Sequence, residues 1–223
     1  ARDRRGWPPM RHIWSAQAVR LPAAAGADLN ARSAVPMSYI DRLDSSGDGV
    51  TVQERDNTLF HVVAAEGLED MGSPAGQALL REALACLVSL GADVNARNEA
   101  GKTALHMAYD GVTADLLISL GAHLDVQSDD GMTPLHIAAG MGDDALVDLF
   151  LRRGASPKVR GPQGMTPLHW VRGRQIADAL LRAGADIDAK DDSGLTPLDR
   201  ALRWLPLNTG VVDALRAHGG RTR

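Results

Sequence analysis

One eight-residue pattern recurs along this chain at nearly constant spacing. It reads GKTALHMA from residue 101, GMTPLHIA from 131, GMTPLHWV from 164 and GLTPLDRA from 194, with a looser DNTLFHVV from 56. The Thr residues of the last four copies are 30, 33 and 30 positions apart. A unit of this length cannot bury its apolar face alone, so repeated copies must stack on one another. The sequence therefore predicts a stack of small units.

Each copy has the residues of a helix start. Its Thr suits an N-cap, because the hydroxyl can accept a hydrogen bond from an unpaired amide of the first turn. Pro follows at the first helical position in Thr133–Pro134, Thr166–Pro167 and Thr196–Pro197. A second apolar run, DALVDLFLRRG at 144–154, has helical spacing and ends at a Gly that can adopt the left-handed conformation. Each unit therefore reads as turn, helix, loop, helix.

These units closely resemble ankyrin repeats, which have a period of about 33 residues and a T-P-L-H-x-A signature. The resemblance implies an all-α ankyrin-repeat solenoid of about five helix-turn-helix units with hairpin loops. We place the units near 56–97, 98–127, 128–160, 161–190 and 191–223. The second and fourth units are three residues short between their helices, and the first has extra residues there.

The part of the chain before these units divides in two by charge. Residues 1–32 form a basic N-terminal extension, in which AAAGADLNAR at 23–32 resembles the tail of a partial capping unit, and residues 33–55 form an acidic insertion. Residues 1–40 carry 6 Lys or Arg against 2 Asp or Glu, whereas 41–100 carry 4 against 11. A nucleic-acid-binding protein needs a continuous basic face to neutralise phosphates, so this distribution disfavours that class.

Cysteine content and hydropathy limit the compartment. The single cysteine, Cys86, leaves no internal disulfide, and no window approaches 18 uninterrupted apolar residues. We therefore expect no membrane span and a cytoplasmic location or another reducing intracellular compartment, an organelle matrix included.

The acidic insertion contains a candidate calcium loop. In LDSSGDGVTVQER, residues 43–55, the positions Asp44, Ser46, Asp48 and Gly49 begin an EF-hand frame, and MSYIDRL before them could form its entering helix. The twelfth position should be a bidentate carboxylate but is Arg55, which leaves Glu54 one residue early. The competing interpretation is a turn followed by a capping box at 51–54 and a helix running into TLFHVVAAEG. We favour the turn and helix start.

Histidines occupy one position in successive units, at His61, His106, His136 and His169. Helices of neighbouring units pack about 8–10 Å apart, whereas zinc ligands lie about 2 Å from the metal, so one ion cannot bridge the row. Each His is expected at N3 of its helix with local hydrogen bonds to the backbone. Asp199 takes this position in the fifth unit, and Cys86 lies on an apolar helical stripe as a small core residue. No catalytic or phosphate-binding motif is present, so we expect no enzyme and no cofactor.

The resemblance also implies a partner-binding surface, because ankyrin repeats recognise proteins through a concave face of inner helices and hairpin tips. The matching positions predict contacts at Lys102, Met107, Tyr109, Met132, Ile137, Met141, Met165, Trp170, Arg172, Leu195 and Arg200. Trp and Arg are typical of binding hot spots, and Met suits adaptable surfaces. The alternative is that Met132 and Met165 tuck beneath the hairpins and that Trp170 fills the space left by the three-residue deletion.

Three functions are consistent with these residues. The first is a noncatalytic protein-interaction module, acting as adaptor, inhibitor or scaffold. The second is an accessory structural subunit of a larger multiprotein assembly, held by its termini and insertion. The third is a calcium-responsive binding protein that uses the 44–54 loop. The first is the hypothesis we carry forward.

Overall fold

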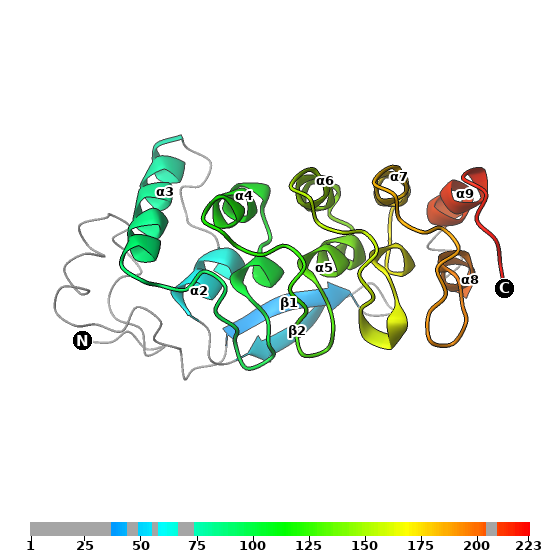
Figure 1. Ribbon diagram of the computed structural model, residues 1–223, viewed down its shortest axis with the longest axis horizontal. Coiled ribbons are helices and arrows are strands. Elements are labelled where there is room, and N and C mark those ends of the chain that lie inside the picture. The colour runs from blue at the N-terminus through cyan, green and yellow to red at the C-terminus, as the bar shows by residue number, and fades with distance from the viewer. Residues whose placement is uncertain (1–36, 44–48, 55–57, 67–73, 204–208) are drawn as a thin grey trace. The chain divides into compact units, whose positions relative to one another are not determined.

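The computed structural model describes residues 37–43, 49–54, 58–66, 74–203 and 209–223 (Figure 1). Internal contacts divide the chain into two compact units, residues 1–39 with 51–123 and residues 40–50 with 124–223. The repeats of both are helical, as the pattern predicts.

The repeats of the first unit contain four helical segments. They are α2 (Leu59–Glu66), α3 (Pro74–Ser89), the 3-10 helix η2 (Ala104–Met107) and α4 (Gly111–Ser119). α2 and α4 both pack against η2. Phe60 on α2, Leu84 on α3 and Leu117 on α4 are buried, so the core of this unit lies between its helices.

The second unit continues the same alternation. Its segments are α5 (Pro134–Met141), α6 (Asp144–Arg152), the 3-10 helices η3 (Pro162–Gly164) and η4 (Pro167–His169), α7 (Arg174–Arg182), α8 (Pro197–Arg203) and α9 (Thr209–Ala217). Figure 1 shows α6, α7 and α9 in one row and α5 and α8 in a second row beneath it. α7 packs against both α6 and α9, and η4 lies between α5 and α8. We call the two rows the outer and inner helices.

The two shortened units have the shortest inner helices. α5, in a full-length unit, has 8 residues, whereas η2 has 4 and η4 has 3. Because an α-helical hydrogen bond joins residues four positions apart and therefore spans five residues, the deletion leaves room for only one 3-10 turn. The Thr–Pro starts predicted at Pro134, Pro167 and Pro197 are all observed.

The hairpins between repeats are tied to one another by a ladder of side-chain hydrogen bonds. In the first unit, Asn95 Oδ1 accepts the backbone N–H of His123 at 2.9 Å. In the second unit, Asp125 Oδ1 accepts the N–H of Ser156 at 3.0 Å. The next residue in this series is Lys158, which has no side-chain acceptor. The ladder is therefore interrupted after the hairpin that contains Lys158.

The acidic insertion contains a β-hairpin, which differs from our prediction. β1 (Met37–Leu43) and β2 (Gly49–Glu54) pair in a two-stranded sheet. The capping box and helix start expected at 51–54 are therefore wrong, and the segment that the calcium-loop alternative gave as an entering helix, residues 37–43, is a strand. Val50, Thr51 and Val52 are β-branched, and such residues favour a pleated strand over a helix.

None of the described helices is long and apolar enough to cross a lipid bilayer. The partial capping unit expected at 23–32 lies outside the described residues.

Candidate functional site

The histidine row links neighbouring repeats within each unit. In the second unit, the backbone N–H of Thr133 donates to His136 Nδ1 at 3.3 Å, and the Thr133 hydroxyl lies 2.8 Å from the same atom. Since Nδ1 accepts, the neutral ring carries its proton on Nε2, which donates to the carbonyl oxygen of Met165 at 3.1 Å. His169 repeats the arrangement with Thr166 at 3.1 Å and with Leu195 O at 3.2 Å.

The first unit has the same bond. His61 Nδ1 accepts the N–H of Thr58 at 3.1 Å, and its Nε2 donates to Lys102 O at 2.8 Å. The local cap predicted for His61 and for His106 is confirmed, since His106 Nδ1 accepts the N–H of Thr103 at 3.0 Å. Sequence analysis missed the second bond, in which Nε2 spans two repeats.

Burial keeps the rings of His136 and His169 neutral. Burial lowers the pKa of His136 from 6.5 to about 4, and the nearby His169 lowers it further, although the bond to Met165 O and the charge of Asp130 oppose the shift. Burial also lowers the pKa of His169, against the opposing effects of its bond to Leu195 O and of Asp191. Because both nitrogens of His136 are engaged, its ring serves the stack and has no free nitrogen for a metal.

No group of three or more His, Cys, Asp or Glu side chains that could hold a metal occurs among the described residues. Of the candidate calcium ligands, Asp44, Ser46 and Asp48 lie outside the described residues, whereas Glu54 ends β2. The loop is flanked by strands rather than by the two helices of an EF-hand. Cys86 is buried on α3, as expected for a core residue.

The structure corrects part of the predicted contact surface. Five of the eleven residues are buried: Lys102, Met107, Ile137, Met165 and Leu195. Met107 is only 1 % exposed, so a partner cannot reach it without unfolding the repeat. Met165 and Leu195 precede the capping Thr, and their backbone oxygens close the hairpins by accepting the N–H of Gly161 and of Asp191. In that position their side chains belong to the core.

The other predicted contacts remain partly or fully exposed. They are Tyr109 in the first unit, and Met132, Met141, Trp170, Arg172 and Arg200 in the second. We call these five residues of the second unit the exposed contact set. Arg172 is the most open of them, and the others are half-buried.

Trp170 and Arg172 both lie against the end of α5. A Cβ atom added to Gly140 would lie 3.9 Å from Trp170 Cε3, and one added to Gly142 would lie 3.7 Å from Arg172 Cβ. Met141 stands between these two glycines in the chain. A Trp, an Arg and a Met are thereby gathered beside two residues that have no side chain. Such a cluster combines aromatic area, positive charge and flexible thioether contact, which are the components of a binding hot spot.

Trp170 has both exposed and buried atoms. It caps η4, where the shortened helix has ended, and the residue is half-buried. Its indole Nε1 is buried and makes no hydrogen bond within the described part of the chain. Trp170 therefore packs partly into the repeat, while the residue as a whole remains partly exposed. Partial burial is compatible with both alternatives drawn from the sequence, a partner contact and a residue that fills space.

Arg200 has an intramolecular partner that sequence analysis did not identify. Its Nη2 lies 2.6 Å from Asp191 Oδ2 and its Nε donates to the same oxygen at 2.8 Å. The Asp191 side chain is completely buried, whereas that of Arg200 is 21 % exposed. Arg200 Nη2 also donates to Gln163 Oε1 at 3.4 Å. The backbone of Gln163 has a left-handed φ of 55°. Arg200 therefore holds two hairpins together in addition to any contact with a partner.

Asp191 is ionised in this arrangement. Burial alone would raise the pKa of its carboxyl group, but the N–H groups of Leu195 and Ser193 and the Arg200 guanidinium outweigh burial and lower that pKa. The only sequence signal for this role of Asp191 was its position, which corresponds to that of Asn98 and Ser128 in earlier hairpins.

We expect Arg200→Ala to lower the free energy of unfolding by about 2 kcal/mol, since it leaves a buried carboxylate without its cation. Arg203→Ala on the same helix is the matched control, because Arg203 is exposed and should change stability by less than about 0.5 kcal/mol. Urea unfolding of both variants measures the difference. Equal stability of the two variants would show that the pair contributes nothing.

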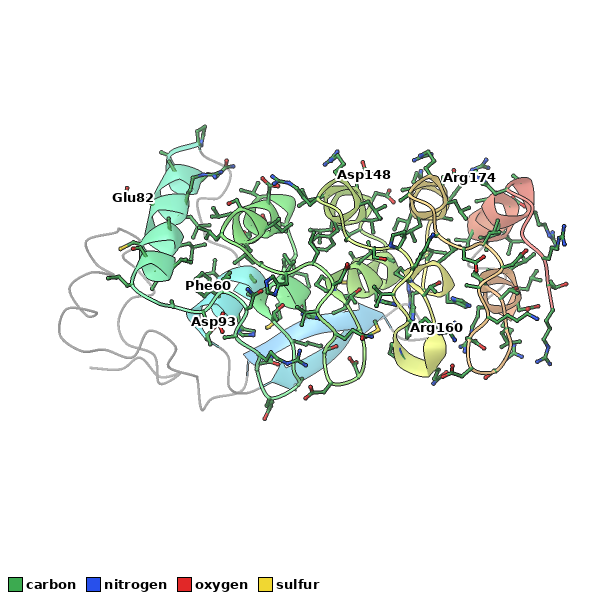
Figure 2. The ribbon with its side chains drawn as sticks, in the orientation of Figure 1. Phe60, Glu82, Asp93, Asp148, Arg160 and Arg174 are labelled. Carbon is green, nitrogen blue, oxygen red and sulfur yellow. The ribbon has the colours of Figure 1, made fainter. Side chains whose placement is uncertain are left out.

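The outer helices offer a different surface. Figure 2 shows Asp148 and Arg174 on the row formed by α6 and α7, and Arg160 on the hairpin that follows α6. Asp148 lies 3.7 Å from Arg152, and Arg174 lies 3.7 Å from Asp178, so acids and bases neutralise one another along the helices. Exposed pairs of this kind contribute little, and this row shows no concentration of one charge.

Comparison with known proteins agrees with the repeat pattern. A family model for ankyrin repeats in three copies matches residues 75–161, and a single-repeat model matches residues 163–192. A search of curated proteins finds no match. Together the two models cover more than half of the chain and include His106, His136 and His169 of the histidine row, both shortened units and the exposed contact set as far as Arg172. Ankyrin repeats are protein-interaction modules, and the chain belongs to the ankyrin-repeat family.

Proposed function

We propose that this protein is a noncatalytic adaptor that binds another protein through the exposed contact set of its second unit. The observation that carries this proposal is the position of Trp170. A large aromatic residue stands at the end of a single 3-10 turn, is only half-buried, and lies beside Gly140. A residue needed only to fill space would be enclosed on all sides.

The neighbours of Trp170 support the same role. Arg172 is exposed next to Gly142, and Met141 and Met132 are half-buried on the same unit. Trp and Arg lose little conformational freedom relative to the contact area they supply, which makes them frequent anchors of interfaces. Binding alone explains the cluster, because it contains no nucleophile, no general base and no metal ligand set.

We expect Trp170→Ala to weaken partner binding by about 2 kcal/mol, roughly 30-fold, and to destabilise the fold by less than Phe150→Ala does. The experiment captures partners with wild-type, Trp170→Ala and Arg172→Ala proteins, identifies the common partner by mass spectrometry and then titrates that purified partner. Arg182→Ala is the matched control, because Arg182 is exposed on the outer helix α7.

The proposal requires Trp170→Ala and Arg172→Ala to lose affinity while Arg182→Ala keeps it. Circular dichroism melting of each variant separates lost contacts from lost structure. If Trp170→Ala binds as tightly as wild type, the partner uses another surface and the proposal is wrong.

A further inference from the structure

The last five residues, 219–223, begin along the path that opens a hairpin in the other repeats. Gly219 has a φ of 86°, close to the 90° of Gly184 at the same position one repeat earlier. The N–H of Gly220 donates to Leu215 O at 2.8 Å, as that of Ala185 donates to Leu180 O at 2.9 Å. The backbone of this segment therefore enters the place where a following repeat would dock.

Arg221 completes the interrupted hairpin ladder. Its N–H donates to Asp188 Oδ1 at 2.8 Å, which is the bond that Ser156 N–H makes with Asp125 two steps earlier in the ladder, before the interruption at Lys158. The hydroxyl of Thr196 donates to Arg221 O at 2.7 Å. The backbone N–H and carbonyl oxygen of Arg221 are thus both bound by side chains, those of Asp188 and Thr196.

Arg223 is held two residues further along. Its N–H donates to Asp199 Oδ2 at 3.0 Å, and its Nη1 donates to the carbonyl oxygen of Ser193 at 3.1 Å. The bonds of Arg221 and Arg223 are made to side chains and a backbone carbonyl that lie within residues 188–199. We call the residues Asp188, Ser193, Thr196 and Asp199 the last-repeat edge.

Asp199 adapts the last-repeat edge to this occupant. In the earlier repeats His occupies this position and donates to a backbone carbonyl, whereas a carboxylate only accepts. Burial alone would raise the pKa of Asp199, but the backbone N–H groups of Thr196 and Arg223 outweigh it and lower that pKa. An ionised acceptor selects a backbone N–H, and with Asp188 it selects a segment of positive charge.

We propose that the last-repeat edge is a recognition site for a short X-X-Arg segment and that residues 221–223 of the same chain occupy it. The site is separate from the exposed contact set, so it adds a second binding function to the adaptor. The chain's own segment covers the site, and a basic segment of another protein binds only when residues 221–223 are displaced or removed.

The test uses a fluorescent peptide, HGGRTR, with both ends blocked. Binding is measured by fluorescence polarisation to the whole chain and to a variant that lacks residues 221–223. We expect the truncated variant to bind at least about tenfold more tightly, because in the whole chain the tethered segment competes at a high effective concentration.

Two modified peptides serve as matched probes. N-methylation of the residue equivalent to Arg223 removes the donor to Asp199 and should weaken binding to the truncated variant by about tenfold, as expected for a hydrogen bond to a charged group. N-methylation of the Thr equivalent to residue 222 is the control, because the amide of Thr222 makes no hydrogen bond within the described part of the chain. Equal affinities of the two modified peptides would overturn the proposal.

A second measurement keeps the whole chain intact and applies even if the truncated variant fails to fold. Amide hydrogen exchange followed by NMR should show Arg221 and Arg223 protected, and Asp188→Ala should accelerate exchange at Arg221 by at least about tenfold. Asp213→Ala, an exposed acid on α9, is the control and should leave Arg221 unchanged. Fast exchange at Arg221 in the wild-type chain would also overturn the proposal.

Discussion

Phe150→Ala lowers the free energy of unfolding by about 3–5 kcal/mol. Phe150 is 1 % exposed on the outer helix α6, which packs against both α5 and α7, and Leu146 and Val147 beside it are equally buried. Truncation leaves a cavity whose walls belong to three different helices. These cannot collapse together without breaking the histidine bonds that fix the spacing of the repeats, so little of the loss is recovered.

Asp148→Ala is the matched control on the same helix. The Asp148 side chain is 57 % exposed, and its pair with Arg152 at 3.7 Å is an exposed one that contributes little. Urea unfolding followed by circular dichroism should show a change below about 0.5 kcal/mol for this variant. Similar losses for both variants would mean that α6 does not have the buried face that the structure gives it.

Lowering the pH from 7 to about 4 is expected to remove about 3 kcal/mol of stability through His136 alone. Its pKa is 6.5 when exposed and about 4 in the folded chain, so between these values the unfolded chain binds more protons. A depressed histidine pKa gives stability that is present above pH 6.5 and is lost as the pH falls toward 4. His169 shifts in the same direction and adds to the loss.

Unfolding in urea at pH 7.5, 6.5, 5.5 and 4.5 measures this dependence. The His136→Gln variant lacks the titrating ring and should have a flatter profile, although its stability at pH 7.5 is lower. Asp191 and Asp199 have pKa values below 3.8, and their contribution is lost only below that pH, outside this window. A variant whose profile is as steep as that of wild type would show that His136 does not cause the dependence.

The repeat architecture could be predicted because it rests on local chemistry that recurs. A Thr that caps a helix, a Pro at the next position and a Gly that ends the second helix act within a few residues, so each copy indicates the same unit. The two shortened units could also be predicted, because a three-residue deletion between the helices shortens the spacing of the repeated pattern. Only the form of the shortened helices, a 3-10 turn at η2 and η4, had to come from the structure.

The acidic insertion was predicted less well because its local signals conflict. Thr51 and Glu54 have capping-box spacing, but Val50 and Val52 flank Thr51 with β-branched residues. The pairing of β2 with β1 decides between the two, and pairing between separate segments is invisible to a local pattern.

The contact surface was predicted in part for a similar reason. Position within a repeat indicates that a side chain belongs to the inner face, but Met165 and Trp170 lie only five residues apart and have different exposures. Whether such a residue is buried depends on how far the next repeat extends over it. The Arg200–Asp191 pair and the Nε2 bonds of the histidines join different parts of neighbouring repeats, which no single copy of the pattern contains.

The interruption of the hairpin ladder at Lys158 has a consequence for protein engineering. At that boundary, Asp192 N–H donates to Gln163 O at 2.9 Å, and Arg160 and Arg200 supply the remaining links. These residues form hydrogen bonds with one another, and the corresponding residues of a consensus repeat would not supply the same partners. Replacing the fourth or fifth repeat by a consensus repeat would therefore require transferring the residues on both sides of this boundary. The boundary bridged by Asp125 should accept a consensus repeat directly.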